Sequence, residues 1–256
     1  MGRRSLIEVI GLDGDDTLWH SEQLFVDTQA RFRELLAPHV DLDEATLDAR
    51  LVEVERGNLA RFGYGVKAFT LSLIETALDV TGGDLPGKDV QAILDLGKYL
   101  LDHPVEQLDR VVDLGKYLLD HPVQLLDGVA EAVDALTDRY RVMVVTKGDL
   151  IHQESKVARS GMAELFWHVE IVSEKDEGGY RRALDRLRID PATFVMVGNS
   201  VRSDVLPVLA IGGRAVHIPY HVTWELEEAE VLPEHAFPVL ASIAELPACI
   251  DALDAQ

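Results

Sequence analysis

The sequence predicts an α/β fold in which a parallel sheet carries an all-helical insertion. Two observations support this prediction. From residue 141 onward, short apolar runs of strand type alternate with helical patterns, which is the order expected for βαβ units. Between Glu22 and about Leu126 no convincing strand occurs, and apolar residues recur at helical spacing instead.

The predicted strands occur in two separate parts of the chain. The first covers about residues 6–12, and four more are predicted at 141–146, 168–172, 193–198 and 214–218. Because the first strand joins the later ones in one sheet, residues 1–19 and 125–256 should form a single domain that is split in sequence. Residues 20–124 then form a helical cap.

The predicted cap contains turn signals and an internal repeat. Gly63-Tyr64-Gly65 and residues 81–87 break it into several helices. Residues 95–105 recur without change at 113–123, an offset of 18 residues. This offset equals about five α-helical turns. Two copies do not make a solenoid, so we interpret the repeat as a tandem duplication that kept the helical phase.

Composition excludes several classes of protein. The formal net charge of −21 argues against a nucleic-acid binder, whose surface would be basic. No stretch is long and apolar enough to span a bilayer, and the apolar run after Arg3 and Arg4 is too short for a signal peptide. The single cysteine, Cys249, excludes an internal disulfide and fits a reducing compartment. We therefore expect a cytoplasmic protein that binds neither nucleic acid nor membrane, with its oligomeric state open.

The first predicted strand ends in an acidic cluster. After the largely apolar residues 7–12 come Asp13, Asp15, Asp16 and Thr17. A buried strand cannot hold such a cluster, so the chain must leave the sheet here, at the carboxyl edge where ligands bind in open α/β sheets. Asp13 and Asp15 are two residues apart, so in extended backbone their side chains point the same way. The alternative for so short a motif is a turn or a helix cap.

Three later strands also end in polar residues. Thr146-Lys147-Gly148 follows the second strand, where a hydroxyl and backbone amides could hold a phosphate-like anion. Lys175 follows the third strand and could neutralise substrate charge. Asn199 and Asp204 follow the fourth, and their oxygens, together with Asp13, could bind Mg²⁺. Each motif alone has a simpler alternative: an ordinary turn at Thr146, a solvated lysine at Lys175, and a helix N-cap at Asn199 or Ser200.

Taken in order, these motifs resemble the haloacid dehalogenase (HAD) superfamily of hydrolases. Asp13-Gly14-Asp15-Asp16-Thr17-Leu18 is similar to its first motif, Thr146 to its second and Lys175 to its third. Asn199 and Asp204 are similar to the fourth. The helical insertion matches the family's cap, which follows the nucleophile strand. The resemblance implies a Rossmann-like three-layer core and an active site roofed by that cap.

The resemblance also implies a mechanism. Asp13 would be the nucleophile that forms an aspartyl-phosphate. Asp15 would protonate the leaving oxygen and then activate water. The set that holds the phosphoryl oxygens would be Thr146, Lys147, Gly148 and Lys175. The set that holds Mg²⁺ would be Asp13, Asp15 through its backbone carbonyl, Asn199 and Asp204.

Some assignments stay open. The fourth motif often begins with aspartate, so Asn199 removes one negative charge and should weaken metal binding. Lys147 and Lys156 compete with Lys175 for the phosphate contact, although only Lys175 follows the third strand. The acidic run at residues 225–230 is predicted to be a solvated helix face.

Asp15 distinguishes between reaction types. By the resemblance, haloacid dehalogenases proper lack the second acid of the first motif and need no Mg²⁺, whereas phosphatases keep this acid. The sequence therefore predicts a Mg²⁺-dependent phosphatase whose partner is a small phosphorylated metabolite. The alternatives are a dehalogenase-type or phosphoglucomutase-type enzyme, or a catalytically weak protein that binds a phospho-ligand.

Overall fold

The computed structural model describes residues 6–102, 123–229 and 236–255, which divide into two compact units. The core unit contains the described residues among 1–20, 122–147 and 153–256. The helical unit contains those among 21–121, together with 148–152. The first division thus falls within one residue of the predicted boundary after residue 19. The sequence did not anticipate that Gly148–His152 belongs with the helical unit.

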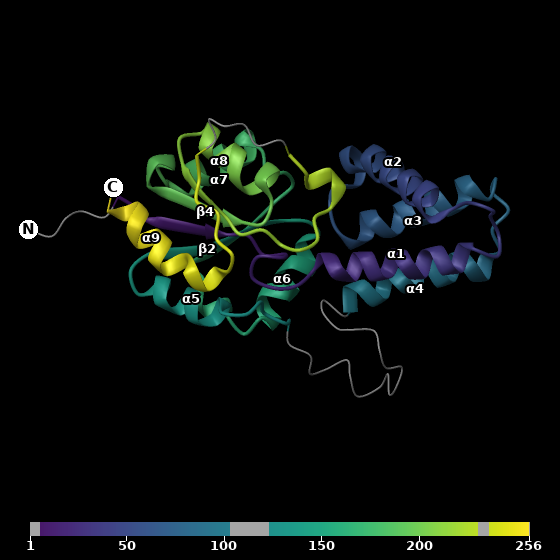
Figure 1. The fold of residues 1–256 in the computed structure, drawn as a ribbon, viewed down its shortest axis with the longest axis horizontal. Coiled ribbons are helices and arrows are strands. Elements are labelled where there is room, and N and C mark those ends of the chain that lie inside the picture. Colours follow the sequence, from purple (N-terminus) through teal and green to yellow (C-terminus); the bar gives the residue numbers. More distant parts are fainter. Residues whose placement is uncertain (1–5, 103–122, 230–235, 256) are drawn as a thin grey trace, which may run out of the picture. The chain divides into compact units, whose positions relative to one another are not determined.

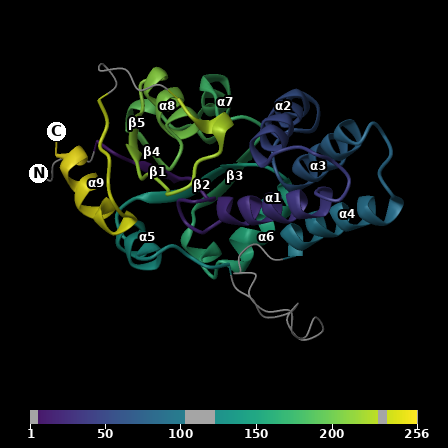
Figure 2. The same cartoon turned by 45° about the vertical axis from the view of Figure 1, so that its right-hand side comes forward.

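The core unit is built on a parallel five-stranded sheet with the order β3-β2-β1-β4-β5. β1 (Val9–Leu12) lies in the middle, between β2 (Arg141–Lys147) and β4 (Phe194–Gly198). The outer strands are β3 (His168–Val172) and β5 (Arg214–His217). Figure 2 shows the strands side by side in this order. The predicted α/β class is confirmed. Among the predicted strand boundaries, the largest error is the start of β1, which begins at Val9 rather than near residue 6.

Helices cover both faces of this sheet. Side chains alternate in direction along each strand, so these apolar strands present hydrophobic residues on both faces, and both must be covered. Ile10 and Val144 face the layer that contains α5 (Val129–Thr137) and α9 (Leu246–Asp254). Their neighbours Val9 and Met143 face the layer that contains α7 (Glu177–Leu187) and α8 (Leu206–Ala210). Figure 1 shows the two helical layers on either side of the strands. The core is therefore a three-layer sandwich.

The helical unit contains four helices within its described residues. They are α1 (Glu22–Leu36), α2 (Glu44–Phe62), α3 (Val66–Val80) and α4 (Gly87–Asp102). α2 begins where the Asp43 side chain accepts a hydrogen bond from the Thr46 N–H, and it ends at Gly63, whose φ of +73° suits glycine. Apolar residues of all four helices, including Phe32, Leu51, Leu73 and Ile93, form its own core. The predicted breaks at residues 63–65 and 81–87 coincide with the ends of α2 and α3.

Gly97 allows α3 and α4 to approach closely. A Cβ atom at this position would lie 2.1 Å from Oγ1 of Thr70 on α3. A glycine inside a helix lowers its stability by about 1 kcal/mol relative to alanine. At Gly97, the close packing of α3 against α4 offsets this loss. Gly97 lies in the first copy of the sequence repeat, of which Asp95–Asp102 belong to α4. The second copy lies almost wholly outside the described residues.

The rest of the chain includes α6 (Leu150–Arg159), which begins in the helical unit and ends in the core unit. Across the described residues, no helix is both long enough and apolar enough to pass through a membrane.

We expect Gly97→Ala to destabilise the protein by roughly 1–3 kcal/mol, because the added methyl collides with Thr70. Gly57→Ala is the matched control, since Gly57 lies within α2 and its Cβ would meet nothing within 4 Å. The control should gain about 0.5–1 kcal/mol from helix propensity. Urea unfolding of both variants measures the difference. A stabilising Gly97→Ala would contradict the close approach of α3 and α4.

Candidate active site

The candidate site lies where strands β1 to β4 end at the carboxyl edge of the sheet. Asp13 directly follows β1, Thr146 is near the end of β2, and Lys175 comes three residues after β3. The chain after β4 carries Asp204 in a π-helical turn, Val201–Val205. Since β1 pairs with both β2 and β4, the topology brings these separate parts of the sequence together at one edge.

The loop after β1 is tightly closed on itself. The N–H groups of Thr17, Leu18 and Trp19 all donate to the Gly14 carbonyl, with the shortest distance, 2.8 Å, from Leu18. A Cβ atom at Gly14 would lie 2.8 Å from the Trp19 ring and 3.4 Å from Oγ1 of Thr146. Gly14 therefore allows this loop to fit between a buried tryptophan and the end of β2. Asp13 and Asp15 are held on either side of it.

Lys175 connects two carboxylates from different loops. Its Nζ lies 2.5 Å from Oδ1 of Asp13 and 2.6 Å from Oδ1 of Asp204, and all three side chains are buried. Burial of a charge is costly unless it is paired, so these three groups stabilise one another. The sequence favoured Lys175 over Lys147 and Lys156 for the phosphate contact, and the structure places its ammonium against Asp13.

The Asp13–Lys175–Asp204 cluster would have one more negative than positive charge if both acids were ionised. Burial and the neighbouring Asp204 carboxylate together raise the pKa of Asp13 to about 8, although Lys175 acts in the opposite direction. Burial alone would lower the pKa of Lys175, but the two carboxylates raise it above its ordinary value. The lysine is therefore held as an ammonium ion. With a pKa of about 8, Asp13 is mostly protonated at neutral pH, and a cation bound beside it would favour its ionised form.

Asp15 is held apart from this cluster by its own partners. Its carboxylate accepts hydrogen bonds from Nζ of Lys156 at 2.6 Å, Nε1 of Trp19 at 2.7 Å and Nε2 of Gln153 at 2.9 Å. Burial alone would raise the pKa of Asp15, yet Lys156, Gln153 and Trp19 together lower it below its ordinary value. Lys156, the competitor to Lys175 in the sequence, is thus a partner of the second acid. Nothing in the sequence distance between residues 15 and 156 indicates this pair.

The turn after β4 fixes the direction of Asp204. The backbone N–H of Ser200 donates to Oδ2 of Asp204 at 3.0 Å, leaving Oδ1 to Lys175. A Cβ atom at Gly198 would lie 2.2 Å from this carboxylate, so only glycine leaves space for it. The predicted N-cap also exists, because the Ser200 hydroxyl accepts a hydrogen bond from the Ser203 N–H.

Glu227 is a residue near this edge that sequence reasoning missed. The run at residues 225–230 was predicted to be solvated, but the Glu227 side chain is only 13% exposed and forms an ion pair with Nζ of Lys147. Oε2 of Glu227 also accepts hydrogen bonds from the hydroxyls of Ser200, at 2.7 Å, and Ser203. The prediction was wrong at this position because Glu227 lies in a short 3₁₀ turn that packs against the core, whereas Glu225 and Glu228 are exposed. No local pattern distinguishes these three acids.

The remaining predicted site residues have less specific surroundings. Thr146 is buried, and its hydroxyl lies 3.5 Å from the Lys147 carbonyl, at the limit of a hydrogen bond. Gly148 begins the segment that belongs to the helical unit and has a φ of +129°. The backbone carbonyl of Asn199 contacts Nε2 of His217 at 3.0 Å. The Lys147 ammonium, predicted to bind phosphate, lies 2.9 Å from the Ser203 hydroxyl and beside Glu227.

The donor set at this edge fits Mg²⁺. Asp13 and Asp204 both reach the same lysine nitrogen, so their oxygens are close together. Within the described ranges, no group of three or more His, Cys, Asp or Glu side chains forms a metal cage. Mg²⁺ is commonly held by one or two carboxylates together with waters and substrate phosphate, which matches a site with two carboxylates.

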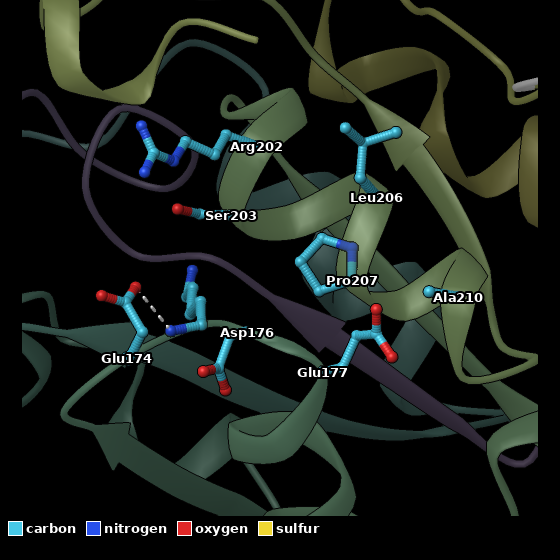
Figure 3. Close-up of a pocket in the computed structure, with 9 residues that line it drawn as sticks. Glu174, Asp176, Glu177, Arg202, Ser203, Leu206, Pro207 and Ala210 are labelled. Atoms are coloured by element: carbon cyan, nitrogen blue, oxygen red, sulfur yellow. Dashed lines mark hydrogen bonds between the residues drawn. The ribbon is translucent and has the colours of Figure 1, made fainter. Parts of the chain in front are cut away.

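A cavity of about 510 Å³ adjoins the cluster. Figure 3 shows Arg202 and Ser203 on one side, Glu174 and Asp176 on another, and Leu206, Pro207 and Ala210 on a third. Lys175 also lines it, and the Lys175 N–H donates to Oε1 of Glu174 at 3.1 Å. The Lys175 ammonium itself is bound to Asp13 and Asp204. This cavity therefore lies next to the reactive groups without containing Asp13 in its lining.

Comparison with known proteins gives a consistent result. The model of the haloacid dehalogenase-like hydrolase family matches residues 7–212. A solved haloacid dehalogenase-like family hydrolase from Xanthomonas campestris is 40% identical, with a TM-score of 0.80. The alignment covers 99% of this chain and 94% of that one. The comparison with curated proteins gives no match.

More distant structures share the fold. A 2-haloacid dehalogenase from Pseudomonas syringae pv. Tomato DC3000 is 21% identical, with a TM-score of 0.59 and coverage of 96% of this chain and 99% of that chain. A protein described as a predicted phosphoglycolate phosphatase, from Haemophilus somnus 129pt, is 14% identical, with a TM-score of 0.60 and the same coverage. At these identities the likeness establishes the fold, and the two names describe different reactions.

We expect Lys156→Met to destabilise the protein by roughly 2 kcal/mol, because it leaves the Asp15 carboxylate without its counter-ion. Asp15 is 29% exposed, so the effect should be smaller than for a fully buried pair. Lys98→Met is the matched control, since the Lys98 side chain is 62% exposed. Urea unfolding at neutral pH measures both. If both variants lost the same small amount of unfolding free energy, the Lys156–Asp15 pair would not contribute to stability.

Proposed function

Because the chain belongs to the haloacid dehalogenase-like hydrolases, we propose that it is a Mg²⁺-dependent phosphatase acting on a small phosphorylated metabolite. The observation that carries the proposal is the separate environment of two acids in one loop. Asp13 pairs with Lys175 beside Asp204, while Asp15 has its own partners two residues later. Acids in different environments can take different chemical roles. We further propose a cytoplasmic location, without a nucleic-acid or membrane partner.

In the first step, a carboxylate oxygen of Asp13 attacks phosphorus. An O–P bond forms to Asp13, the P–O bond to the leaving group breaks, and Asp15 gives its proton to the leaving oxygen. Asp15 must be protonated and released from Lys156 for this step. Lys175 keeps Asp13 in place, and Thr146 and Lys175 hold the phosphoryl oxygens.

In the second step, water attacks phosphorus and the bond to Asp13 breaks, which releases inorganic phosphate. Asp15 now takes the proton from this water. The contacts of Asp15 with Lys156, Gln153 and Trp19 favour its ionised form, which is the form that a general base requires. The two steps thus return Asp13 to a carboxylate and Asp15 to its protonated state.

Charge balance supports the need for a dication. Three lysines at this edge each pair with a carboxylate: the buried Lys156 and Lys175, and the partly exposed Lys147. A phosphate ester brings more negative charge, so repulsion with Asp13 would oppose attack. Bound by Asp13 and Asp204, with the Asp15 carbonyl and Asn199 as further candidate ligands, Mg²⁺ would supply electrostatic stabilisation of the transferring phosphoryl group.

Asp15 also favours phosphate-ester hydrolysis over dehalogenation. Cleavage of a carbon–halogen bond releases halide, which needs no proton, so its first step requires no general acid beside the nucleophile. Transfer of a phosphoryl group between hydroxyls, as in phosphoglucomutase-type enzymes, would use the same residues. The dehalogenase remains the second candidate because several distant structures of the same fold have that name.

Asp13→Asn should lower Mg²⁺-dependent phosphate release by at least about 1,000-fold, because an amide cannot form the covalent intermediate. The measurement is phosphate release from a panel of small phosphate esters, with Mg²⁺ and with chelator. Asp134→Asn, an exposed change on α5, is the matched control and should keep full activity. Equal activity of Asp13→Asn and wild type would refute the assignment of the nucleophile.

The dehalogenase alternative has a separate test. The phosphatase proposal predicts that wild-type protein releases no chloride from 2-chloropropionate, with or without Mg²⁺. Ion chromatography of the reaction mixture measures chloride directly. Chloride release that is independent of Mg²⁺ and abolished in Asp13→Asn would instead establish carbon–halogen hydrolysis.

A further inference from the structure

Glu227 is a largely buried carboxylate that the proposed reaction does not use. It lies in the short turn Glu225–Glu227, while Glu225 and Glu228 on either side are exposed. The turn is attached to the core unit through its backbone, because Nη1 of Arg202 donates to the Leu226 carbonyl at 2.6 Å. Glu227 points inward from this turn, so its charge needs partners within the protein.

The partners of Glu227 come from two different loops. Oε1 pairs with Nζ of Lys147, the last residue of β2 and the neighbour of Thr146. Oε2 accepts from the hydroxyls of Ser200 and Ser203, which belong to the turn after β4. Nζ of Lys147 also lies 2.9 Å from Oγ of Ser203, which closes the network.

This network continues to Asp204 through two further hydrogen bonds. The Ser203 N–H donates to Oγ of Ser200 at 3.1 Å, and the Ser200 N–H donates to Oδ2 of Asp204 at 3.0 Å. Movement of the two hydroxyls would therefore change the direction of the carboxylate that binds Lys175. At the other end, movement of Lys147 would displace the adjacent Thr146.

We propose that Glu227 is a positioning residue that fastens the end of β2 to the turn after β4, and so sets the relative placement of Thr146 and Asp204. Its importance for catalysis rests on the proposed function, in which Thr146 holds the phosphoryl oxygens and Asp204 would bind Mg²⁺. Glu227 itself does not touch Asp13. Burial alone would raise its pKa, but Lys147 and the two hydroxyls lower it, so the residue is ionised at neutral pH.

The first experiment measures whether Glu227 holds Lys147, independently of any activity. Metal-free protein is treated with acetic anhydride, and acetylation of each lysine is followed by mass spectrometry, with exposed Lys98 as the internal reference. The Lys147 ammonium is held by Glu227 and Ser203, which hinders its reaction, so Glu227→Gln should increase acetylation of Lys147 by roughly 5-fold or more relative to Lys98. Glu228→Gln, the matched control, should leave it unchanged. An unchanged rate in Glu227→Gln would overturn the proposal.

The second experiment measures the effect on turnover. Glu227→Gln should lower kcat/KM for a phosphate ester by roughly 10-fold, because small misplacement of reacting groups slows chemistry. Glu228→Gln should stay within about 2-fold of wild type, since isolated surface changes have small effects. Faster acetylation of Lys147 with unchanged kcat/KM would overturn the positioning role. Wild-type protein without phosphatase activity would instead refute the proposed function, and the acetylation result would still stand.

A third variant guards against loss of folding. Glu227→Asp keeps the charge and shortens the side chain by one methylene, so it should weaken the network without removing it. The proposal predicts that acetylation of Lys147 increases from wild type to Glu227→Asp to Glu227→Gln, and that kcat/KM decreases in the same order. Melting temperatures of all three proteins identify a variant that has unfolded. Any other order among folded variants would contradict the proposal.

Discussion

The central constraint on this molecule is the burial of the Lys175 ammonium between the carboxylates of Asp13 and Asp204. Three charges out of contact with water are tolerated only if their distances are short and their remaining polar atoms have partners. The sheet order supplies the short distances, because β1 and β4 are neighbours and the chain after β3 reaches the same edge. Gly198 supplies the space, since a side chain there would overlap Asp204.

The same constraint explains how so acidic a chain could act on an anion. With a formal net charge of −21, the surface should repel phosphate esters at long range. At the edge of the sheet, however, three lysines, two of them fully buried, are each paired with a carboxylate. Their charge is thus fixed in place. A substrate phosphate would meet oriented ammonium groups and oxygen ligands for a dication, so little reorganisation would be needed when it binds.

Much of the fold could be predicted because its signals are local. Strand and helix periodicities, and turn residues such as Gly63, depend on neighbours within a few positions. The positions of Asp13, Thr146, Lys175 and Asp204 at strand ends follow from the same patterns, combined with the rule for parallel sheets. Glu227 could not be found in this way. Its two exposed neighbours have the same charge, and only packing of the turn selects which acid faces inward.

By itself, the sequence determined the α/β class, the helical insertion and the strand ends that carry the candidate residues. Only the tertiary structure decided which lysine pairs with which acid. Lys175 binds Asp13 from 162 residues away, Lys156 binds Asp15 from 141, and Lys147 binds Glu227 from 80. These choices depend on strand order and on distances of a few ångströms between loops. An ion pair depends on separation in space, and periodicity along the chain contains no measure of that separation.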